Sequence, residues 1–258
     1  MSELRVPWTL ARDDFDLEVV LRLKGSATVA VIIPAQNEAA TIGGVLDAVR
    51  RTSSLVDELV VINDHSNDDT VTVAHHHGAG VLTLEGPTGK GVAMTAGLAA
   101  TTAELVVFLD ADVLNTGDDF IPRLLQPLLV NSGVQLVKGY YDRPLHHMPS
   151  GGGRVTELAA RPILSLLYPG LGEIRQPLAG ETAGRRRALS QIVLEPTYGV
   201  EIALLIDIAQ RFGAESLAQV DLGIRRHRNR PLDELRPMAV DVLRAALSRS
   251  SIAIPPQD

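Results

Sequence analysis

Residues 28–34 read TVAVIIP, an unbroken run in which β-branched apolar side chains predominate. Such a run predicts a strand that is buried on both faces, as strands are in the parallel sheets of α/β proteins. Predicted helices and strands alternate after it. The expected helices are 38–51, 68–77, 89–101 and 118–130, and the expected strands are 58–63, 80–84, 104–109 and 135–141. This order predicts a mostly parallel, doubly wound sheet with right-handed crossovers.

The pattern changes after residue 142, where regular alternation gives way to helices and glycine-containing loops. We therefore expect two halves, residues 1–142 and residues 143–258, within one continuous α/β domain. A further helix is expected at 13–24, helices at 154–167, 199–212 and 232–247, and a strand at 216–220. A chain of 258 residues is long enough to bury a core of this kind.

The composition argues against several classes of protein. The net charge of −7 disfavours a general nucleic-acid binder. The apolar stretches are much shorter than the roughly 20 residues that cross a bilayer, so we expect no membrane span. Residues 1–12 lack the apolar core of a signal peptide. The chain has no cysteine, which excludes disulfides and thiolate sites and agrees with a cytoplasmic location.

Charge is distributed unevenly along the chain. Residues 1–142 hold 9 Lys and Arg against 19 Asp and Glu, whereas residues 143–230 hold 12 Arg and no Lys against 8 acidic residues. Arg makes forked, bidentate contacts with phosphate and carboxylate groups. The Arg-only segment therefore indicates a local anion site, although a solvated surface position remains the alternative for any single Arg.

Polar segments follow three of the predicted strands and open one predicted helix. They are residues 34–38 (PAQNE), 63–70 (NDHSNDDT), 110–112 (DAD) and, at the helix start, 89–91 (GKG). Ligands of open α/β sheets bind at the carboxyl ends of the strands. Each segment alone is common, but their order and spacing together favour a site for a nucleoside diphosphate sugar.

The chemistry of such a donor accounts for these residues. Asp112 can offer an oxygen ligand to Mg²⁺ or Mn²⁺, ions that share phosphate oxygens and neutralise charge on a departing diphosphate. Asp110 can accept hydrogen bonds from ribose or sugar hydroxyls. Glu38 and Ser66 are placed to bind the base and ribose, and Lys90 to lie near the base or diphosphate. The alternative is that the two aspartates only cap the loop and the helix that begins near residue 118. That interpretation is disfavoured, because carboxylates at the end of a buried strand lose solvation.

These strand-end segments resemble the nucleotide-sugar half of GT-A fold glycosyltransferases. The second half carries more specific motifs, namely residues 151–158 (GGGRVTEL), 176–181 (QPLAGE), 198–202 (YGVEI) and 227–232 (HRNRPL). Together they resemble the glucosyl-3-phosphoglycerate synthase family over roughly residues 28–240. The resemblance implies transfer of glucose from UDP-glucose to the 2-hydroxyl of 3-phosphoglycerate, with the α configuration retained.

The resemblance also implies a role for each matched residue. It assigns Asp112 and His227 to the metal and Glu201 to the sugar, and these three form the expected catalytic set. The acceptor is expected to bind Gly153, Arg154, Thr156 and Asn229. Backbone N–H groups at a helix start, with an Arg and a hydroxyl, form a ready anion site. The donor is expected to bind Pro34, Ala35, Gln36, Glu38, Ser66, Lys90, Asp110, Ala111, Gly180 and Tyr198.

Two residues depart from the family pattern. Ala111 stands where the family usually has Ser, which removes a hydroxyl and leaves both carboxylates in place. Gln36 stands where Leu is common, next to the base pocket. The resemblance further implies a homodimer built by the C-terminal helices. It also implies retention without a covalent intermediate, in which a β-phosphate oxygen of the donor takes the proton of the attacking hydroxyl.

Several other functions remain open at this point. A mannosyl-3-phosphoglycerate synthase would use GDP-mannose on the same acceptor, and other small anionic acceptors are conceivable. A polyprenyl-phosphate glycosyltransferase shares the first half but requires membrane-facing helices. A non-catalytic nucleotide-binding module is disfavoured because Asp110, Asp112 and His227 are all present. A dinucleotide-binding dehydrogenase is disfavoured because no Gly-x-Gly-x-x-Gly turn follows the first strand.

Overall fold

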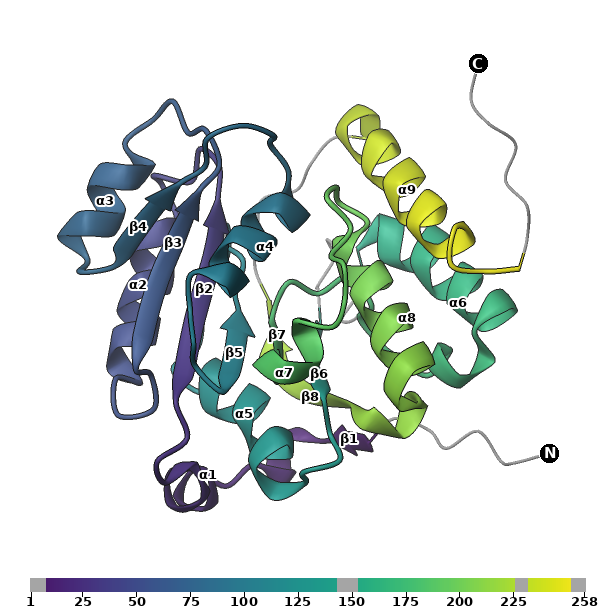
Figure 1. The fold of residues 1–258 in the computed structure, drawn as a ribbon, viewed down its shortest axis with the longest axis horizontal. Helices are drawn as coiled ribbons and strands as arrows, with labels where there is room; N and C mark the ends of the chain where they lie inside the picture. Colours follow the sequence, from purple (N-terminus) through teal and green to yellow (C-terminus); the bar gives the residue numbers. More distant parts are fainter. Residues whose placement is uncertain (1–7, 143–152, 226–231, 252–258) are drawn as a thin grey trace.

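The computed structural model describes residues 8–142, 153–225 and 232–251. Within these ranges eight strands form one sheet in the order β1-β8-β6-β7-β5-β2-β3-β4 (Figure 1). The strands are β1 (Trp8–Leu10), β2 (Val29–Ala35), β3 (Glu58–Asn63), β4 (Gly80–Thr83), β5 (Leu105–Phe108), β6 (Leu136–Asp142), β7 (Thr182–Arg185) and β8 (Leu217–Ile224). The helices are α1 (Leu17–Lys24), α2 (Ile42–Arg51), α3 (Thr70–His76), α4 (Lys90–Ala99), α5 (Phe120–Val130), α6 (Arg161–Leu167), α7 (Arg186–Leu189), α8 (Val200–Phe212) and α9 (Leu232–Leu247).

The predicted α/β fold with a mostly parallel sheet is confirmed. Neighbouring strands pair in parallel except β7, which runs antiparallel to both β5 and β6. Strands from residues 1–142 and from residues 143–258 belong to the same sheet. The division of the chain at residue 142 stays a prediction.

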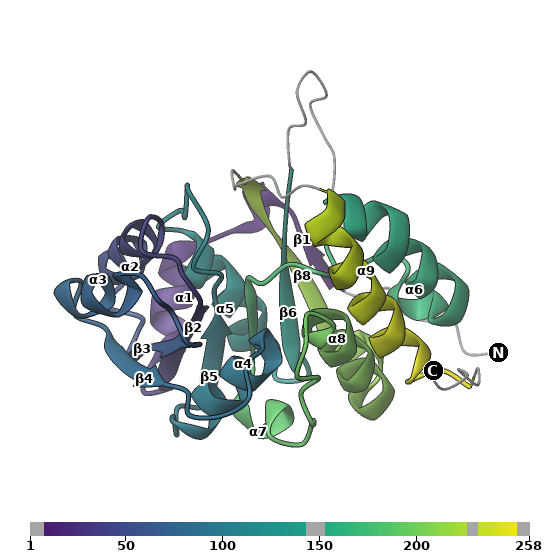
Figure 2. The ribbon, with the colours of Figure 1, turned by 90° about the horizontal axis from the view of Figure 1, so that it is seen from above.

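Helices cover both faces of the sheet because its central strands are apolar on both faces. In β2, Val31 and Ile33 pack toward α2 and α5, while Ile32 packs into a second core beneath α4, α6, α8 and α9. Figure 2 shows α6, α8 and α9 gathered on one side of β6 and β8. No helix in the described part of the chain is long and apolar enough to cross a membrane.

Some predicted elements differ from those observed. The expected helix at 13–24 begins only at Leu17, because the side chain of Asp16 caps it by accepting from the backbone N–H of Val19. The expected helix at 154–167 is helical over the same residues, and differs only in a π-helical turn at Thr156–Ala160 that continues into α6. Strand β1 was not predicted, since three residues are too few to show a period.

The antiparallel direction of β7 brings its first residue to the edge where the parallel strands end. Thr182 lies opposite Phe108, the last residue of β5, and opposite Lys138 of β6. The turn formed by residues 179–181 therefore stands beside the polar segment that follows β5. The site described below is built at this edge.

Candidate active site

The acidic pair after β5 is the centre of the candidate site. Asp110 and Asp112 lie at the carboxyl edge of the sheet, with side chains 20% and 28% exposed. Ala111 between them is buried among the core residues around α5. Both carboxylates therefore stand on the site side of the strand end, where a ligand can reach them.

A glycine turn presents Lys90 to this pair. Gly89 has φ near +142°, a conformation that side chains rarely adopt, and its N–H donates to Asp64 Oδ2 at 2.9 Å. The backbone N–H of Gly91 donates to Pro196 O at 3.1 Å. A Cβ at position 91 would overlap the carbonyl oxygen of Glu195. Glycines thus let the start of α4 press against the loop that precedes α8.

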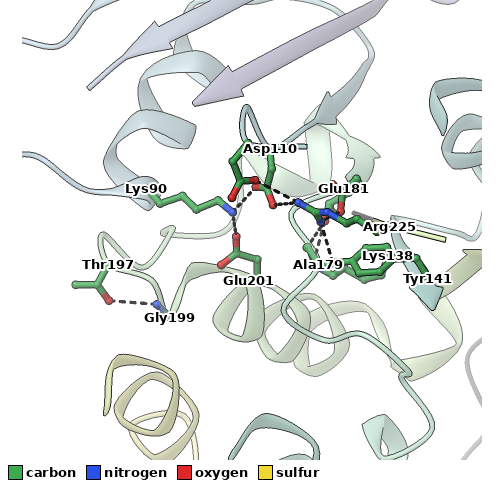
Figure 3. Close-up of polar contacts among 12 residues, drawn as sticks. Lys90, Asp110, Lys138, Tyr141, Ala179, Glu181, Thr197, Gly199, Glu201 and Arg225 are labelled. Atoms are coloured by element: carbon green, nitrogen blue, oxygen red, sulfur yellow. Dashed lines mark hydrogen bonds and ion pairs between the residues drawn. The ribbon is translucent and has the colours of Figure 1, made fainter. Parts of the chain in front are cut away.

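Lys90 bridges two carboxylates from different parts of the chain. Its Nζ lies 2.6 Å from Asp110 Oδ1 and forms an ion pair with Glu201 in the first turn of α8 (Figure 3). Burial opposes the charge of Lys90, but these two carboxylates outweigh it and raise its pKa above the ordinary value. Burial also opposes the charge of Asp110 and by itself would raise the pKa of that carboxyl. The positive charges of Lys90 and Arg225 instead hold the pKa below its usual range. Lys90 and Asp110 are therefore both charged at neutral pH.

Arg225, the last described residue after β8, links the acidic pair to the turn before β7. Its side chain is 2% exposed, and Nη2 lies 3.0 Å from Asp110 Oδ2 and 3.4 Å from Asp112 Oδ1. Nη1 lies 2.6 Å from Glu181 Oε2 and donates to the Tyr141 hydroxyl at 2.8 Å. Burial raises the pKa of Glu181 and Arg225 opposes that rise. One guanidinium at the end of β8 thus joins groups at the ends of β5, β6 and β7.

The turn at residues 179–181 packs directly against the acidic pair. A Cβ at Gly180 would overlap the carboxylate of Asp110, so only glycine fits this position. Beneath the turn lies the side chain of Lys138, which is 1% exposed. Its Nζ donates to Ala179 O at 2.5 Å and to Thr182 Oγ1 at 2.9 Å.

The loops after β2 and β3 hold each other through side chains. The N–H of Asn37 donates to Ser66 Oγ at 3.0 Å, and Asn37 Oδ1 accepts from the N–H of Asn67 at 2.7 Å. Asn37 and His65 both adopt positive φ, near 57° and 56°, which is uncommon for side-chain-bearing residues. Strained backbone of this kind often marks a ligand site.

The remaining predicted donor residues lie on or near these loops. Pro34 and Ala35 end β2. Gln36 Nε2 donates to Thr88 Oγ1 at 3.4 Å, which joins the loop after β2 to the turn before α4. Glu38 Oε2 accepts from Thr41 Oγ1 at 2.9 Å. Tyr198, just before α8, is 40% exposed.

The predicted acceptor residues lie on a separate segment. Thr156 is buried at the start of the π-helical turn before α6, and Arg154 two residues earlier is exposed. The carbonyl of Gly153 accepts from the N–H of Glu157 at 2.9 Å, which starts the helical turn. His227 and Asn229 lie outside the described residues. The structure thus brings together Lys90, Asp110, Asp112, Gly180 and Glu201. Gly153, Arg154 and Thr156 belong to the segment that leads into α6.

The chemistry of Asp112 fits a hard divalent cation. Its carboxylate is more exposed than that of Asp110, and its contact with Arg225 is the longer one at 3.4 Å. Within residues 8–142, 153–225 and 232–251 there is no cluster of three or more His, Cys, Asp or Glu side chains suited to a metal. An Mg²⁺ or Mn²⁺ ion that binds mainly through substrate phosphates needs only a few ligands from the protein. The metal-ligand pair of Asp112 with His227 stays a prediction, and His227 lies outside the described residues.

Sequence reasoning missed three buried contributors: Arg225, Lys138 and Tyr141. Arg225 was read only as part of a basic segment. Lys138 had a visible signal, since a charge in the middle of the apolar strand 135–141 is unfavourable to bury without a partner. Tyr141 carried no signal, because its contact with Arg225 joins residues 84 positions apart.

Comparison with known proteins adds evidence on the family. Residues 30–159 match the model of glycosyl transferase family 2. The glucosyl-3-phosphoglycerate synthase of Mycobacterium tuberculosis is 45% identical over 96% of this chain and 79% of that protein. A crystal structure of the M. tuberculosis enzyme with Mn²⁺, UDP-glucose and phosphoglyceric acid superposes with a TM-score of 0.89 at 43% identity, covering 98% of this chain and 90% of that one. Another, with Mg²⁺ and UDP, also has a TM-score of 0.89 at 43% identity and covers 96% and 88%.

Proposed function

The chain belongs to the glucosyl-3-phosphoglycerate synthase family of glycosyltransferases, and we infer that it transfers glucose from UDP-glucose to the 2-hydroxyl of 3-phosphoglycerate. The products are glucosyl-3-phosphoglycerate and UDP. The structural observation that carries this inference is the buried bridge from Lys90 to Asp110 and Glu201, joined to Arg225 at the carboxyl edge of the sheet. This cluster lies where α/β sheets bind nucleotides.

The donor occupies the edge formed by the ends of β2, β3 and β5. The base and ribose lie over the loops that carry Gln36, Glu38 and Ser66, which the contacts described above hold in place. Lys90 supplies positive charge next to the diphosphate. Asp110 and Glu201 accept hydrogen bonds from sugar hydroxyls, and Gly180 allows the turn before β7 to lie against the Asp110 carboxylate.

Asp112 and His227 would hold the Mg²⁺ or Mn²⁺ ion. The ion supplies positive charge that stabilises the diphosphate as it leaves. The protein keeps the Asp112 carboxylate available to the ion, because Arg225 lies 3.4 Å from Asp112 but 3.0 Å from Asp110. Binding of UDP should therefore depend on a divalent cation through Asp112.

The acceptor lies between the sugar and the segment that carries Gly153, Arg154 and Thr156, with Asn229 completing the set. Phosphate and carboxylate of 3-phosphoglycerate are matched by an Arg side chain, a hydroxyl and helix-start N–H groups. Positioning the acceptor hydroxyl next to the anomeric carbon supplies much of the rate enhancement of such a reaction.

The arrangement of charges supports retention without a covalent intermediate. Both oxygens of Asp110 contact protein cations, Lys90 on one side and Arg225 on the other. Glu201 is paired with Lys90. Carboxylates held in this way are weak nucleophiles, so the 2-hydroxyl attacks on the face from which UDP departs. Its proton passes to a β-phosphate oxygen of the donor.

A comparison of acceptors and donors tests the function. With saturating UDP-glucose and Mg²⁺, we expect 3-phosphoglycerate to exceed glycerate by more than about 100-fold in kcat/KM. The reason is that two charge-assisted contacts to the phosphate would be lost, each worth about 1.5–3 kcal/mol. Released nucleotide and the glycoside product are measured together. Equal rates for the two acceptors, or a preference for GDP-mannose over UDP-glucose, would refute this assignment of substrates.

A homodimer and a cytoplasmic location are the remaining parts of the proposal. The dimer is supported by large apolar side chains exposed on the segment before and within α6, where Leu158 and Leu166 are each 79% exposed. Apolar side chains this exposed are common at subunit contacts. Light scattering of the purified protein tests the dimer, and cell fractionation tests the location.

A further inference from the structure

Lys138 is a buried charged residue that the proposed reaction does not use. This lysine is in the middle of β6 and is 1% exposed, so its ammonium group is enclosed by protein. Its neighbours on the same face of the strand belong to the apolar core beneath α8, including Leu136. An apolar side chain of similar volume would fill this position without the loss of solvation that a buried charge suffers.

The contacts of Lys138 are directed at one backbone turn. Its Nζ donates to the carbonyl of Ala179 at 2.5 Å and to Thr182 Oγ1 at 2.9 Å. The Thr182 hydroxyl in turn donates to the same carbonyl at 3.3 Å. These bonds hold both ends of the turn that contains Gly180 and Glu181. Figure 3 shows Lys138 beside Ala179, close to Glu181 and Arg225.

The turn is in direct contact with the donor side of the site. Gly180 touches the carboxylate of Asp110 so closely that a Cβ would overlap it. Glu181 binds Arg225, which holds the other side of Asp110. A small displacement of the turn would therefore move Asp110 from both directions.

We propose that Lys138 is a positioning residue of the transferase, which fixes the turn at residues 179–182 and through it the carboxylate of Asp110 against the sugar. This role rests on the proposed function for its catalytic meaning, while the anchoring of the turn stands on the geometry alone. Lys138 does not touch the substrates. It acts through the backbone carbonyl of Ala179 and the side chain of Thr182.

The electrostatic surroundings of Lys138 agree with this role. The charged groups that act on it come from four elements and are Glu201, Lys90, Glu181 and Asp110. Burial is the largest influence and lowers the pKa of Lys138 to about 8, against opposition from the three carboxylates. A lysine that is costly to bury and bonded to one turn is better explained by placement of that turn than by stability of the core.

The test compares Lys138→Met with Leu136→Met, a matched control on the same face of β6 that does not contact the turn. We expect Lys138→Met to lower kcat by about 10- to 100-fold, because ångström-scale misplacement of a reacting group has effects of this size. The Kd for UDP in the presence of Mn²⁺ should stay within about threefold of wild type, since the nucleotide loops are untouched. Leu136→Met should leave both quantities unchanged.

A second variant and a second measurement make the test independent of folding defects. Thr182→Val removes the hydroxyl shared by Nζ and the Ala179 carbonyl, and should lower kcat in the same direction. Hydrogen exchange reports the turn itself. Amides within residues 176–184 should exchange at least about tenfold faster in Lys138→Met and not in Leu136→Met, as expected for loss of a charge-assisted bond.

The outcomes separate this inference from the proposed function. If wild-type protein makes no glucosyl-3-phosphoglycerate, the proposed function fails, and the exchange measurement still decides whether Lys138 anchors the turn. If wild-type protein is active and Lys138→Met keeps its kcat, the positioning role is refuted. Equal losses of kcat and UDP affinity would also refute it, because they would indicate a general disturbance of the site.

Discussion

Replacing Arg225 by Met tests the charge arrangement of the site most directly. The substitution leaves Asp110 with Lys90, and it leaves Asp112 partly in solvent at 28% exposure. Glu181, however, is 1% exposed and would lose Arg225, its ion-pair partner among the described residues. Removing one partner of a buried pair typically costs about 3–5 kcal/mol, because the remaining charge is neither paired nor solvated. The expected loss in free energy of unfolding at pH 7.5 is therefore about 3–4 kcal/mol.

The upper limit of this loss follows from protonation. The variant can escape the buried charge by protonating Glu181, which at pH 7.5 costs about 4.4 kcal/mol for a carboxyl of ordinary pKa near 4.3. The folded variant then holds a proton that the unfolded chain lacks, so the folded state gains stability as the pH falls. The difference from wild type should shrink by up to about 1.4 kcal/mol per pH unit between pH 7.5 and pH 5.5.

The assay is urea unfolding of wild type, Arg225→Met and the double variant Arg225→Met/Glu181→Gln at both pH values. The double variant has no buried carboxylate at this position and should recover most of the lost stability and lose the pH dependence. A loss below about 1 kcal/mol for Arg225→Met would refute the reasoning. So would a loss that is the same at pH 5.5 as at pH 7.5.

Three further predictions concern other parts of the site. Asp112→Asn should abolish the dependence of UDP binding on Mn²⁺ in calorimetry, and His227→Ala should have the same effect. If either variant keeps the wild-type metal dependence, the substituted residue is not a metal ligand. Arg154→Ala should raise the KM for 3-phosphoglycerate by about 10- to 150-fold and leave UDP affinity unchanged, as steady-state kinetics will show, and an equal loss of UDP affinity would place it in the donor site. Because the folded-state pKa of Lys138, about 8, lies below the unfolded value of 10.5, the unfolded chain binds more protons between these pH values. Wild-type stability measured against Lys138→Met should therefore rise by roughly 2–3 kcal/mol from pH 8 to pH 10.5, and a flat difference would contradict it.

The parallel part of the fold could be predicted because its signal is local. The run at residues 28–34 contains consecutive apolar side chains that serve two cores, and this is what an unbroken apolar pattern means physically. The direction of β7 could not be predicted in the same way. Its four residues, Thr182–Arg185, are too few to show a period, and their pairing depends on the sheet formed around them.

The site could be predicted only where its residues lie at strand ends or in family motifs. The approach of Lys90 to Asp110 follows from two such segments meeting at one edge. The contact between Arg225 and Asp110 joins residues 115 positions apart and needs the final register of β8 beside β6. No local pattern carries that register. Lys138 is the intermediate case, because its sequence position reveals that its charge must be buried but not which turn it holds.

The structure gives a physical reason for different roles within the pair Asp110 and Asp112. The end of β8 and the start of α4 bring a guanidinium and an ammonium to opposite oxygens of Asp110, at 3.0 and 2.6 Å. Those oxygens can still accept hydrogen bonds from hydroxyls, but a cation would have to displace a protein charge to bind them. Asp112 is two residues further along, more exposed and 3.4 Å from Arg225, so its oxygens remain more accessible to a metal ion. The proposed division between a sugar-binding and a metal-binding carboxylate thus depends on which protein cations reach each residue.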